Sequence, residues 1–510
     1  MTPQQSRRSF IKKSALTAAA AGLSACNHAN AQGANGDLRV AVVGFKSRGL
    51  NHIQDIKRLE GVRLVALCDV DSEVLAKGVA ANPGVQGYED MRKMLENKDI
   101  DAVSIASPNH LHSIQGIWSL QAGKHLFIEK PLSHNIYEGR QLVAASEKYS
   151  NLIVQAGTQS RSGVGIRAAI KDVHSGVYGK VLVSRAICYK RRKSIGPAKK
   201  NAIPSTINYD LWCGPAPMAE STRGNQTDPD NETKSQGPVH YDWHWFWNWG
   251  GGDLCNQCIH EIDIARWFLN EPDVSPEVVS IGGRFGYRDA AETPNTFISV
   301  HNYAKAPLIT EVYGLASSKA KNAAMNKYGK FPKAPEIGIV VECEHATIVV
   351  PDYNSAIAYG KDDRKVIKSY GKSVDQVDLS GGQSGHHANW VSHIRKGTNE
   401  GIHSPLRDCH VSTALVHSAN ISYRLGKRQT AAEITAAINS SAGLSEAFVR
   451  MQDHLGKNGV NLTNSKAVLG AALTQDTKTE LFTGANAARA NADLCARRDG
   501  RAPFRIPAVG

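Results

Sequence analysis

The sequence predicts an α/β protein whose N-terminal part is a doubly wound parallel sheet of the Rossmann type. Short β-branched strands alternate with helical segments between residues 37 and 157, and the connections between them are short. A glycine-containing turn follows the first strand, and an acidic residue ends the second. Alternating strands and helices of this kind form a parallel sheet that helices cover on both faces.

The expected elements follow the order that this fold requires. Most strands are short apolar runs bounded by Gly or Asp, and the helices carry apolar residues at spacings of three and four. In chain order the elements are strand 38–43, helix 48–59, strand 62–68, helices 73–81 and 88–97, strand 102–106, helix 113–122 and strand 125–128.

The turn after the first strand is the candidate phosphate site. Its sequence, Gly44-Phe45-Lys46-Ser47-Arg48-Gly49, keeps the first and last glycines of G-x-G-x-x-G but has Lys at the middle one. Such glycines admit a pyrophosphate to the backbone, and the helix N-terminus stabilises its charge. Asp69 ends the second strand, where a carboxylate accepts the ribose hydroxyls of NAD and repels the 2′-phosphate of NADP. NAD is therefore the expected cofactor, unless Asp69 merely begins the turn 69–72.

The first 35 residues are interpreted as an export signal and linker. Ser6-Arg7-Arg8-Ser9-Phe10-Ile11-Lys12 precedes a weakly apolar run, and no acidic residue occurs before Asp37. This segment resembles a twin-arginine signal, which implies the twin-arginine export machinery as a partner and a periplasmic or exported protein. Two processing sites stay open. Leu23-Ser24-Ala25-Cys26 resembles a lipobox that would anchor Cys26 to a lipid, and Ala29-Asn30-Ala31 fits ordinary signal peptidase.

Composition excludes several classes of protein. With 510 residues, 41% hydrophobic and 21% charged, the chain suits two or three globular domains rather than a collagen-like, coiled-coil or mainly disordered protein. The net charge is +13, but basic residues are scattered among acids, which argues against a nucleic-acid partner. No run reaches about 18 apolar residues, so we expect no membrane-spanning helix.

Three motifs stand further along the chain. They are Ser107-Pro108-Asn109-His110-Leu111-His112, Glu129-Lys130-Pro131 and the segment 250–263, which contains Gly-Gly-Gly, Asn256, His260 and Asp263. In this order they resemble the T-P-N-x-x-H, E-K-P and G-G-x…D-x-x-x-H-x-x-D motifs of the Gfo/Idh/MocA family, named for glucose/fructose oxidoreductase and inositol dehydrogenase. The resemblance covers roughly residues 37 to 430.

The resemblance implies an NAD-binding Rossmann domain at 37–157 and an α/β domain at 158–430. The open, mainly antiparallel sheet of the second domain would carry the substrate site and often an oligomer interface, so we expect a homo-oligomer, either a dimer or a tetramer. Residues 431–510 remain as a C-terminal extension whose end, 501–507, is expected to form a strap across the domains. The expected cofactor-binding residues are Gly44, Ser47, Arg48, Gly49, Asp69, Ser107, Asn109, His112, Glu129, Lys130 and Gln159.

Lys130 is the first catalytic candidate. Oxidation of a sugar hydroxyl needs a group that takes the proton and a donor to the oxygen. Lys130 follows a strand at the carboxyl edge of the predicted sheet, where ligands bind, and desolvation would lower the pKa of its amine. In the family the matching lysine contacts the reacting hydroxyl. The alternative is a surface lysine in a turn.

A predicted helix over residues 253–269 supplies the other candidates. Helical spacing aligns Asn256, His260 and Asp263 along one stripe, so they would face one pocket. The family commonly has Asp where this chain has Asn256. Because Asn orients a hydroxyl but accepts no proton, Lys130 and His260 would carry the acid/base chemistry. Against this, a histidine on a helix is commonly structural.

Two further segments contain substrate candidates. Trp245 belongs to a run with tryptophan at every second position from 243 to 249, where carbohydrate stacking and core packing are both open. Arg191 and Arg192 follow a predicted strand and could bind a carboxylate or sulfate, or face solvent or another subunit. We expect no metal site, because the late histidines lack an H-E-x-x-H motif and the pair Cys255 and Cys258 lacks a second pair.

Three classes of function remain open. The first is an NAD-dependent oxidoreductase that acts on a sugar, a polyol or a sugar derivative with tightly bound cofactor. The second is a glycoside hydrolase that uses NAD for transient oxidation, elimination and re-reduction. The third is a redox-inactive carbohydrate-binding lipoprotein, against which Lys130 argues because binding alone needs no tuned amine. Outside the cytoplasm a cofactor cannot be replaced, so an exported enzyme should turn over without net oxidation.

Overall fold

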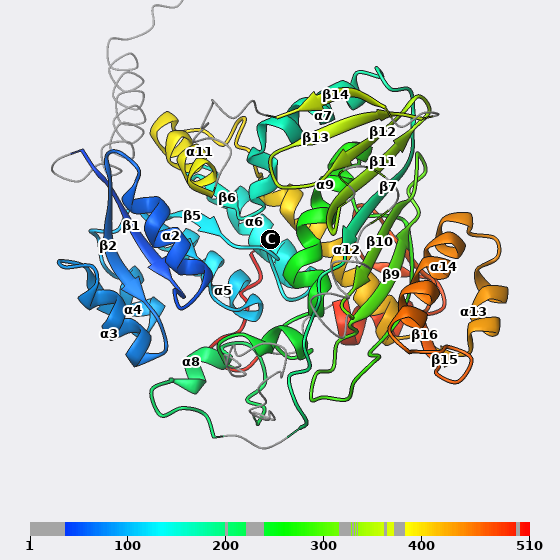
Figure 1. Ribbon diagram of the computed structural model, residues 1–510. Helices are drawn as coiled ribbons and strands as arrows, with labels where there is room; N and C mark the ends of the chain where they lie inside the picture. Colours follow the sequence, from blue (N-terminus) through cyan, green and yellow to red (C-terminus); the bar gives the residue numbers. More distant parts are fainter. Residues whose placement is uncertain are drawn as a thin grey trace, which may run out of the picture.

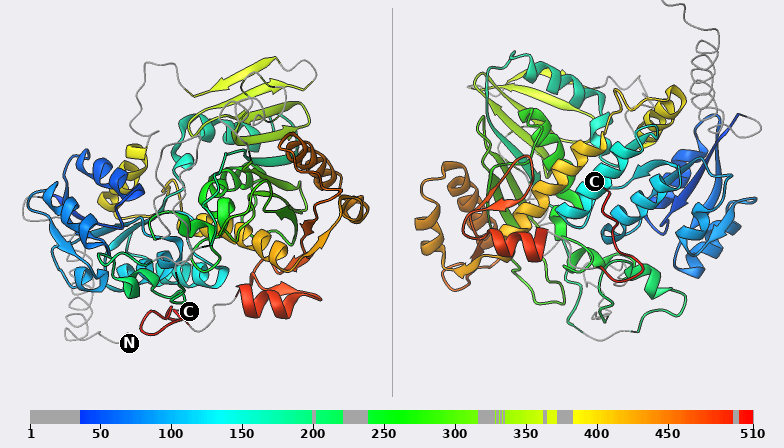
Figure 2. Two further views of the ribbon diagram at one scale, coloured as in Figure 1. Left: turned by 60° about the horizontal axis from the view of Figure 1, so that its bottom comes forward. Right: turned by 180° about the vertical axis from the view of Figure 1, so that it is seen from behind.

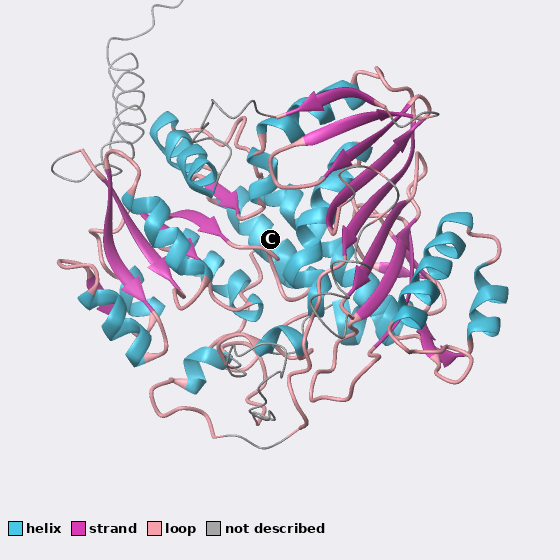
Figure 3. Cartoon of the chain, viewed as in Figure 1, coloured by secondary structure: helices cyan, strands magenta, loops and turns pink. Residues whose placement is uncertain are grey.

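The computed structural model describes residues 36–198, 202–220, 239–315, 328, 331, 333, 335–361, 365–371, 383–495 and 500–509. The predicted leader, residues 1–35, lies outside the described residues. The described chain forms two sheets, one parallel and one mixed, that stand side by side with helices between and around them (Figures 1 and 3). None of the described helices is long and apolar enough to span a membrane.

The first sheet is a six-stranded parallel sheet in the order β3-β2-β1-β4-β5-β6. This confirms the predicted doubly wound fold. Its strands are β1 (Leu38–Val43), β2 (Val62–Cys68), β3 (Gln86–Tyr88), β4 (Ala102–Ile105), β5 (His125–Ile128) and β6 (Val154–Ala156). The helices between them are α2 (Arg48–Lys57), α3 (Ser72–Ala80), α4 (Met91–Leu95), α5 (Asn109–Gln121) and α6 (Ile136–Lys148).

Two elements differ from the sequence prediction. The strand β3 precedes α4 where a single helix over 88–97 was expected, because this short polar segment acquires its strand geometry only by pairing with β2. The helix α5 begins at Asn109, four residues before the expected start at 113. Pro108 is its N-cap residue, with φ −60° and ψ 152°, so the helix begins immediately after the extended proline.

The second sheet is mainly antiparallel, as predicted, and only the pair β7 and β10 is parallel. Its order is β14-β13-β12-β11-β7-β10-β9-β8-β16-β15, with β17 pairing to β8 and to β18. The strands are β7 (Val181–Cys188), β8 (Glu277–Gly283), β9 (Thr296–His301), β10 (Leu308–Tyr313), β11 (Ile337–Cys343), β12 (Ala346–Val350), β13 (Ala356–Gly360), β14 (Val366–Tyr370), β15 (Lys427–Gln429), β16 (Ala467–Leu469), β17 (Leu473–Gln475) and β18 (Phe482–Thr483).

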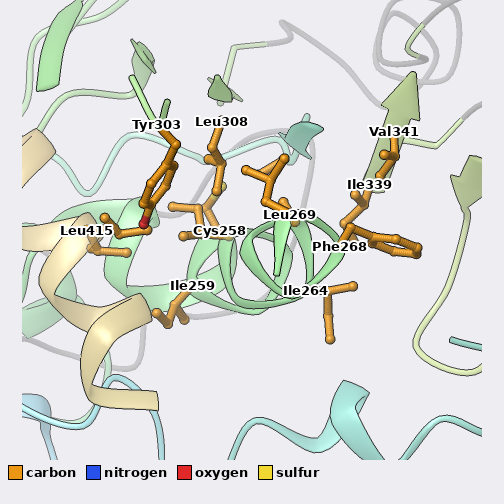
Figure 4. Packing of buried hydrophobic residues seen from close by; sticks show 14 of the residues in the cluster. Cys258, Ile259, Ile264, Phe268, Leu269, Tyr303, Leu308, Ile339, Val341 and Leu415 are labelled. Carbon is orange, nitrogen blue, oxygen red and sulfur yellow. The ribbon is translucent and has the colours of Figure 1, made fainter. Parts of the chain in front are cut away.

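Helices cover both faces of this sheet. On the inner face, α9 (Ile259–Leu269) lies between β10, β11 and α12 (Leu406–Arg424), and Figure 4 shows its apolar side chains packed on Leu308, Ile339 and Leu415. On the outer face, α13 (Ala431–Ile438) and α14 (Ala442–Lys457) form a second core with alternate residues of the same strands (Figure 2). The remaining helical segments are η1 (Gln159–Ser162), α7 (Val164–His174), α8 (Tyr209–Cys213), η2 (Asp242–Trp245), η3 (Leu254–Cys258), α11 (Gln383–Lys396), α15 (Ala487–Arg489) and η4 (Ala490–Cys495).

Segments late in the sequence join both domains. The segment 431–495 adds β16, β17 and β18 to the second sheet, so it is continuous with that domain rather than a separate appendage. The helix α11 packs on the first domain instead, where Trp390 is fully buried beside Phe127. The end of the chain, with Phe504, also packs into the core of the first domain. Both domains are therefore completed by residues distant in sequence.

Candidate functional site

A cavity of about 430 Å³ lies at the carboxyl edge of the parallel sheet. Residues that follow β1, β2, β4 and β5 line one side of it, and Asn256, His260 and Tyr353 of the second domain line the other. Ligands in open parallel sheets bind at this edge. The predicted site residues that line the cavity are Gly44, Ser47, Arg48, Asp69, Ser107, Asn109, His112, Glu129, Lys130, Gln159, Asn256 and His260. Their individual roles stay predictions.

The turn after β1 has the close backbone packing that its glycines suggested. Gly44 has φ +73°, and a Cβ there would lie 2.8 Å from the Cα of Ser107. At Gly49 a Cβ would overlap the carbonyl oxygen of Gly44, so Gly49 shapes the turn although it does not line the cavity. Ser47 is the N-cap residue of α2 but makes no capping hydrogen bond. The first amides of α2 therefore have no side-chain acceptor, which suits a bound phosphate.

Asp69 is held in the cavity wall by two backbone amides. Its carboxylate accepts hydrogen bonds from the N–H groups of Phe45 and Asp71, each at 3.0 Å. Burial raises the pKa of Asp69, and the two amide hydrogen bonds oppose this shift. Next to it, a 2.8 Å hydrogen bond between Asp71 Oδ2 and His240 Nε2 joins the first domain to the segment 239–249. The carboxylate at the end of β2 is thus fixed where an adenosine ribose binds in this fold.

His112 connects the two loops that the family motifs define. Its Nδ1 lies 2.6 Å from the carbonyl oxygen of Pro131, and its Nε2 lies 2.8 Å from that of Ser107. Burial lowers the pKa of His112. Both ring nitrogens are engaged by backbone, so His112 positions the loop that carries Lys130.

Glu129 anchors the other side of the same loop. Its Oε1 accepts hydrogen bonds from Arg48 Nε at 2.6 Å and from His52 Nε2 at 3.1 Å, and its Oε2 lies 3.2 Å from the amide of Lys130. Burial by itself opposes ionisation, but Arg48 and His52 hold the pKa of Glu129 well below its usual range. Glu129 is therefore a fixed negative charge beside Lys130.

Lys130 lies, partly buried, at the junction of the two domains. Its peptide bond to Pro131 is cis, and its Nζ donates a 2.5 Å hydrogen bond to the carbonyl oxygen of Asn256. Burial lowers the pKa of Lys130, and Glu129 partly offsets this shift. The acceptor carbonyl belongs to η3, a π-helical turn of a type frequent at functional sites. The amine is thereby held against the segment that carries His260.

His260 is buried beside Lys130 and Tyr353. Its ring centroid lies 5.3 Å from that of Tyr353, and burial together with the nearby Lys130 amine holds its pKa well below the usual range. Its Nδ1 is a buried polar atom without a hydrogen-bond partner in the described chain. A neutral imidazole with a free nitrogen can donate to or accept from a substrate oxygen.

Two expected cofactor ligands also have unpartnered atoms in the cavity wall. They are Nδ2 of Asn109 and Oε1 of Gln159, both buried and without a partner in the described chain. Buried polar atoms are normally hydrogen-bonded, so such atoms on a cavity wall mark groups that a ligand satisfies. With the phosphate turn and Asp69, they make the described residues fit a dinucleotide.

Four predicted substrate ligands lie outside the cavity. Asp263 is fully buried and paired with Arg161 at 2.7 and 2.9 Å, although it lies in the same helix, α9, as His260. Arg192 forms a bidentate pair with Asp253 at 2.5 and 2.8 Å, and Trp245 is buried beneath Arg192 at 5.1 Å. Arg191 does not line the cavity. None of the four lines the cavity in this structure, and their roles in substrate binding stay predictions.

Sequence reasoning missed several cavity residues. Tyr241, Trp243 and His244 belong to or adjoin the tryptophan run. The density of aromatic residues indicates this segment, but it does not indicate which of its members line the cavity. Tyr353 lies between β12 and β13 and accepts a 2.7 Å hydrogen bond from Gln257. Phe504 comes from the end of the chain. No motif surrounds Tyr353 or Phe504, so only the fold reveals them.

The cysteine pair is structural in character. Cys255 and Cys258 are buried free thiols, and burial raises the pKa of Cys258 well above its usual range and that of Cys255 to about 12. Cys258 packs in the core of the second domain. In the described part of the chain, no group of three or more His, Cys, Asp or Glu side chains is arranged to hold a metal ion.

The fold and the cavity define a protein of the two-domain, dinucleotide-binding class. Residues 38–158 match the oxidoreductase family model for an NAD-binding Rossmann fold, and residues 163–309 match that for the C-terminal α/β domain. Together the two models match more than half of the 510 residues, and the chain belongs to the Gfo/Idh/MocA oxidoreductase family. Its N-terminal domain is an NAD-binding Rossmann domain.

Individual relatives match shorter parts of the chain. A glycosyl hydrolase family 109 protein from Shewanella sp. strain ANA-3 is 33% identical over 169 residues, which are 28% of this chain and 37% of that protein. An inositol 2-dehydrogenase/D-chiro-inositol 3-dehydrogenase from Lacticaseibacillus casei is 28% identical over 176 residues, which are 34% of this chain and 51% of that protein. The alignments thus span about half or less of these relatives.

A solved structure matches the fold over a longer part of the chain. The WlbA dehydrogenase of Bordetella pertussis, in complex with NADH and UDP-GlcNAcA, superposes with a TM-score of 0.53. The superposition covers 76% of this chain and 97% of that protein at 19% sequence identity. At this identity the likeness shows the shared fold.

Proposed function

We propose that this protein is an NAD-dependent oxidoreductase that acts on a sugar, a polyol or a sugar derivative. The observation that carries the proposal is that one cavity contains the dinucleotide elements, Gly44 and Asp69, together with the Lys130 amine and the His260 imidazole. A binding protein has no use for a desolvated amine at this position. The substrate class is supported by the sugar-related relatives and by the aromatic and polar wall formed by Tyr241, Trp243 and Tyr353.

The roles of the residues follow from their protonation states. Bound NAD would supply the hydride acceptor. Lys130, with its pKa lowered by burial, accepts the hydroxyl proton at Nζ, and His260 Nδ1 hydrogen-bonds to the substrate oxygen. Asn256 contributes its backbone carbonyl to the position of Lys130. Glu129 stays ionised and stabilises the ammonium that forms, since opposite charges in a buried site interact strongly.

A second function, NAD-dependent glycoside cleavage, is favoured by the 33% identity to a glycosyl hydrolase family 109 protein. In that reaction the substrate is oxidised transiently, the glycosidic bond breaks by elimination, and the hydride returns to the product. The same two residues would serve both functions. The two reactions differ in their products, since only the glycosidase releases an aglycone without net oxidation.

Product analysis separates the two functions. Purified protein would be incubated with a glycoside and polyol library in the absence of added dinucleotide, and products identified by mass spectrometry. Masses lower by two hydrogens identify the oxidoreductase, with a matching reduced product if turnover is redox-neutral. Released aglycones with unchanged sugar oxidation level identify the glycosidase. Absence of either product, with NAD present on the protein, contradicts both.

We further propose that the protein is exported by the twin-arginine route with cofactor already bound. The proposal depends on Arg7 and Arg8 in the leader. The double change Arg7→Lys and Arg8→Lys should leave the protein in the cytoplasm, as measured by fractionation. Cys26→Ser should abolish membrane association if the lipobox is used and leave it unchanged if signal peptidase cuts after Ala31. Unchanged periplasmic delivery of the double variant would contradict export by this route.

A homo-oligomer, either a dimer or a tetramer, is also proposed. The basis is the second sheet, whose edge strand β14 exposes Val366 and Ile367, each 55% exposed. Light scattering coupled to size exclusion measures the mass directly. A monomeric mass at micromolar concentration would contradict the proposal.

A further inference from the structure

The last described residues, 500–509, form a segment that we call the C-terminal strap. Arg501 pairs with Asp210 of α8 and donates to the carbonyl oxygen of Gly214 at 3.1 Å, while the amide of Val509 donates to Gln141 of α6 at 2.8 Å. Between these two anchors the strap runs alongside α5, as the red segment in Figures 1 and 2 shows. The strap is therefore attached at one end to α8, which follows β7 in the sequence, and at the other end to α6 of the first domain.

Phe504 is the strap residue that reaches the cavity. Its side chain is only 2% exposed and lines the cavity together with Met91 and with Gln115 and Trp118 of α5. The rings of Phe504 and Trp118 lie 6.3 Å apart, centroid to centroid. Exposed Arg505, its neighbour along the chain, does not line the cavity. The strap thus presents one aromatic ring to the cavity wall.

The position of Phe504 identifies the part of a ligand that it would meet. Asp69 at the end of β2 marks the adenosine ribose in this fold, and Lys130 marks the opposite, reactive end. Phe504 lies on the Asp69 side, because its neighbour Met91 begins α4 directly after β3, the partner strand of β2. An adenine attached to a ribose at Asp69 would therefore lie toward Phe504.

Two guanidinium groups hold the Phe504 ring in place. Arg92 lies over the ring at 5.1 Å and Arg501 at 5.0 Å. Arg92 is itself fixed by a bidentate pair with Asp90, with distances of 2.7 and 3.0 Å. Because the ring is only 2% exposed and has guanidinium groups over it, it offers the cavity a fixed apolar contact rather than a free face, and it loses little entropy when a base binds.

We propose that the C-terminal strap caps the adenine end of the dinucleotide site, and that it slows dissociation of the bound cofactor through Phe504. This inference rests on the proposed NAD-dependent function and adds a binding residue to it. An apolar contact at the adenine end does not depend on the oxidation state of the nicotinamide, so the strap retains oxidised and reduced cofactor alike. A cofactor retained in this way stays with the enzyme through successive turnovers.

The experiment compares cofactor loss from full-length variants. Protein purified with bound NAD is incubated with an NAD-hydrolysing enzyme, which destroys released nucleotide, and the nucleotide still bound is measured over time after denaturation. Phe504→Ala should accelerate loss about 10-fold, because it removes the apolar wall at the adenine end. Phe504→Leu fills most of the same core volume and keeps part of this contact, so its rate should lie between those of wild type and Phe504→Ala. Phe504→Tyr should remain close to wild type.

Arg505→Ala is the matched control on the same strap, and it should leave the rate unchanged. Circular dichroism establishes that each variant is folded, and Phe504→Leu decides the result if Phe504→Ala does not fold. Equal rates for wild type and Phe504→Leu overturn the capping role while leaving the NAD-dependent function intact. Wild-type protein that neither carries nor binds NAD overturns the proposed function, and the capping role with it.

Discussion

Lys130 shows how a single side chain depends on both domains. Its backbone belongs to the first domain, where Glu129 and His112 fix the loop, yet its amine donates to a carbonyl of the second domain. Burial lowers the pKa of the amine, and the adjacent Glu129 carboxylate limits that shift. The amine is thus able to exchange a proton nearer to neutral pH than an exposed lysine could.

The first prediction concerns this amine. Lys130→Met should lower the turnover number by about 10²- to 10⁴-fold, because it removes a positioned acid/base group, while bound NAD stays near wild-type occupancy. Turnover and nucleotide content are measured on the same preparation. Lys93→Met, at an exposed lysine of the same domain, is the control. Wild-type turnover by Lys130→Met on every active substrate would remove the central residue of both enzymatic functions.

His260 and Asn256 are expected to matter less. His260→Ala should reduce turnover by a smaller factor than Lys130→Met, since the imidazole orients the substrate oxygen. Asn256→Asp should retain measurable activity, because Lys130 contacts the backbone carbonyl of this residue and not its side chain. Steady-state kinetics on one substrate rank the three variants. A larger loss for His260→Ala than for Lys130→Met would reverse the assigned roles.

Glu261 gives a prediction of pH dependence. This carboxyl is 1% exposed, accepts a 3.2 Å hydrogen bond from Gln257, and has its pKa raised to about 8 by burial. The unfolded chain ionises near pH 4.5 while the folded protein keeps the proton, so stability is lost as pH rises from about 4.5 to 8. Glu261→Gln should remove this loss, up to about 1.4 kcal/mol per pH unit.

Urea unfolding of wild type and Glu261→Gln at pH 5 and pH 8 tests this effect. The stability advantage of Glu261→Gln should be larger at pH 8. An advantage that is equal at the two pH values, or larger at pH 5, would show that Glu261 does not hold its proton in the folded protein.

At the scale of elements, α14 illustrates how the C-terminal segment completes the second domain. Phe448 and Met451 of this helix are buried against Ile309 and Val300 on the outer sheet face, while Val449 is 64% exposed. The helix is amphipathic, as its apolar residues at 444, 447, 448, 451 and 455 indicate. A sheet face that the resemblance made a candidate oligomer interface is thus partly covered by the chain itself.

We predict that a substitution at Phe448 of α14 lowers the free energy of unfolding, whereas one at its neighbour Val449 does not. Phe448→Ala should lower the free energy of unfolding by about 3 to 5 kcal/mol, because a large buried side chain is replaced by a cavity. Val449→Ala should change it by less than about 0.5 kcal/mol, because that side chain faces solvent. Denaturant unfolding followed by circular dichroism measures both. Equal effects would show that α14 does not pack on the sheet in this orientation.

The structure differs most from the helix predicted by the sequence pattern at η3. The apolar spacing of 253–269 predicts one regular helix, but five residues form a π-turn before α9 begins at Ile259. Asn256 lies within this turn, and its carbonyl oxygen accepts the hydrogen bond from Lys130. The spacing of Ile259, Ile262 and Leu269 does not detect such a turn, because all three residues lie in α9, after it.

At the scale of the whole molecule, buried histidines make stability sensitive to acid. In nine of them burial lowers the pKa to about 3 or 4: His52, His110, His125, His134, His244, His301, His386, His417 and His454. Below pH 6.5 the unfolded chain binds protons that the folded protein does not take up until pH 3 to 4. Stability is therefore lost as pH falls from about 6.5 to 4.

Each such histidine contributes a slope of up to about 1.4 kcal/mol per pH unit, so the sum should give steep acid unfolding. Thermal unfolding at pH 7, 6 and 5 should show a falling midpoint, with the steepest change below pH 6. His301→Gln, at a residue buried in β9 without a ring hydrogen bond in the described chain, should flatten the dependence. A midpoint constant from pH 7 to 5 would contradict the prediction.

The doubly wound sheet, the glycine turn after β1 and the place of Asp69 at the end of β2 could all be predicted from the sequence, because each depends on residues adjacent in the chain. Strand and helix periodicities, a glycine at a tight turn and an acid at a strand end are local signals. The motif that contains Lys130 is also a run of adjacent residues. The sheet domain that follows the Rossmann domain could be predicted once the family motifs were recognised.

Which polar residues line the cavity is known from the tertiary structure and not from the sequence. Asp263 and Arg192 carry the right chemistry, yet Arg161 and Asp253 pair with them because buried charges require partners. Tyr353 and Phe504 carry no motif, and they reach the site because a sheet loop and the end of the chain pack there. The pairing of buried charges and the packing of distant segments depend on residues far apart in the sequence, so local sequence patterns do not predict them.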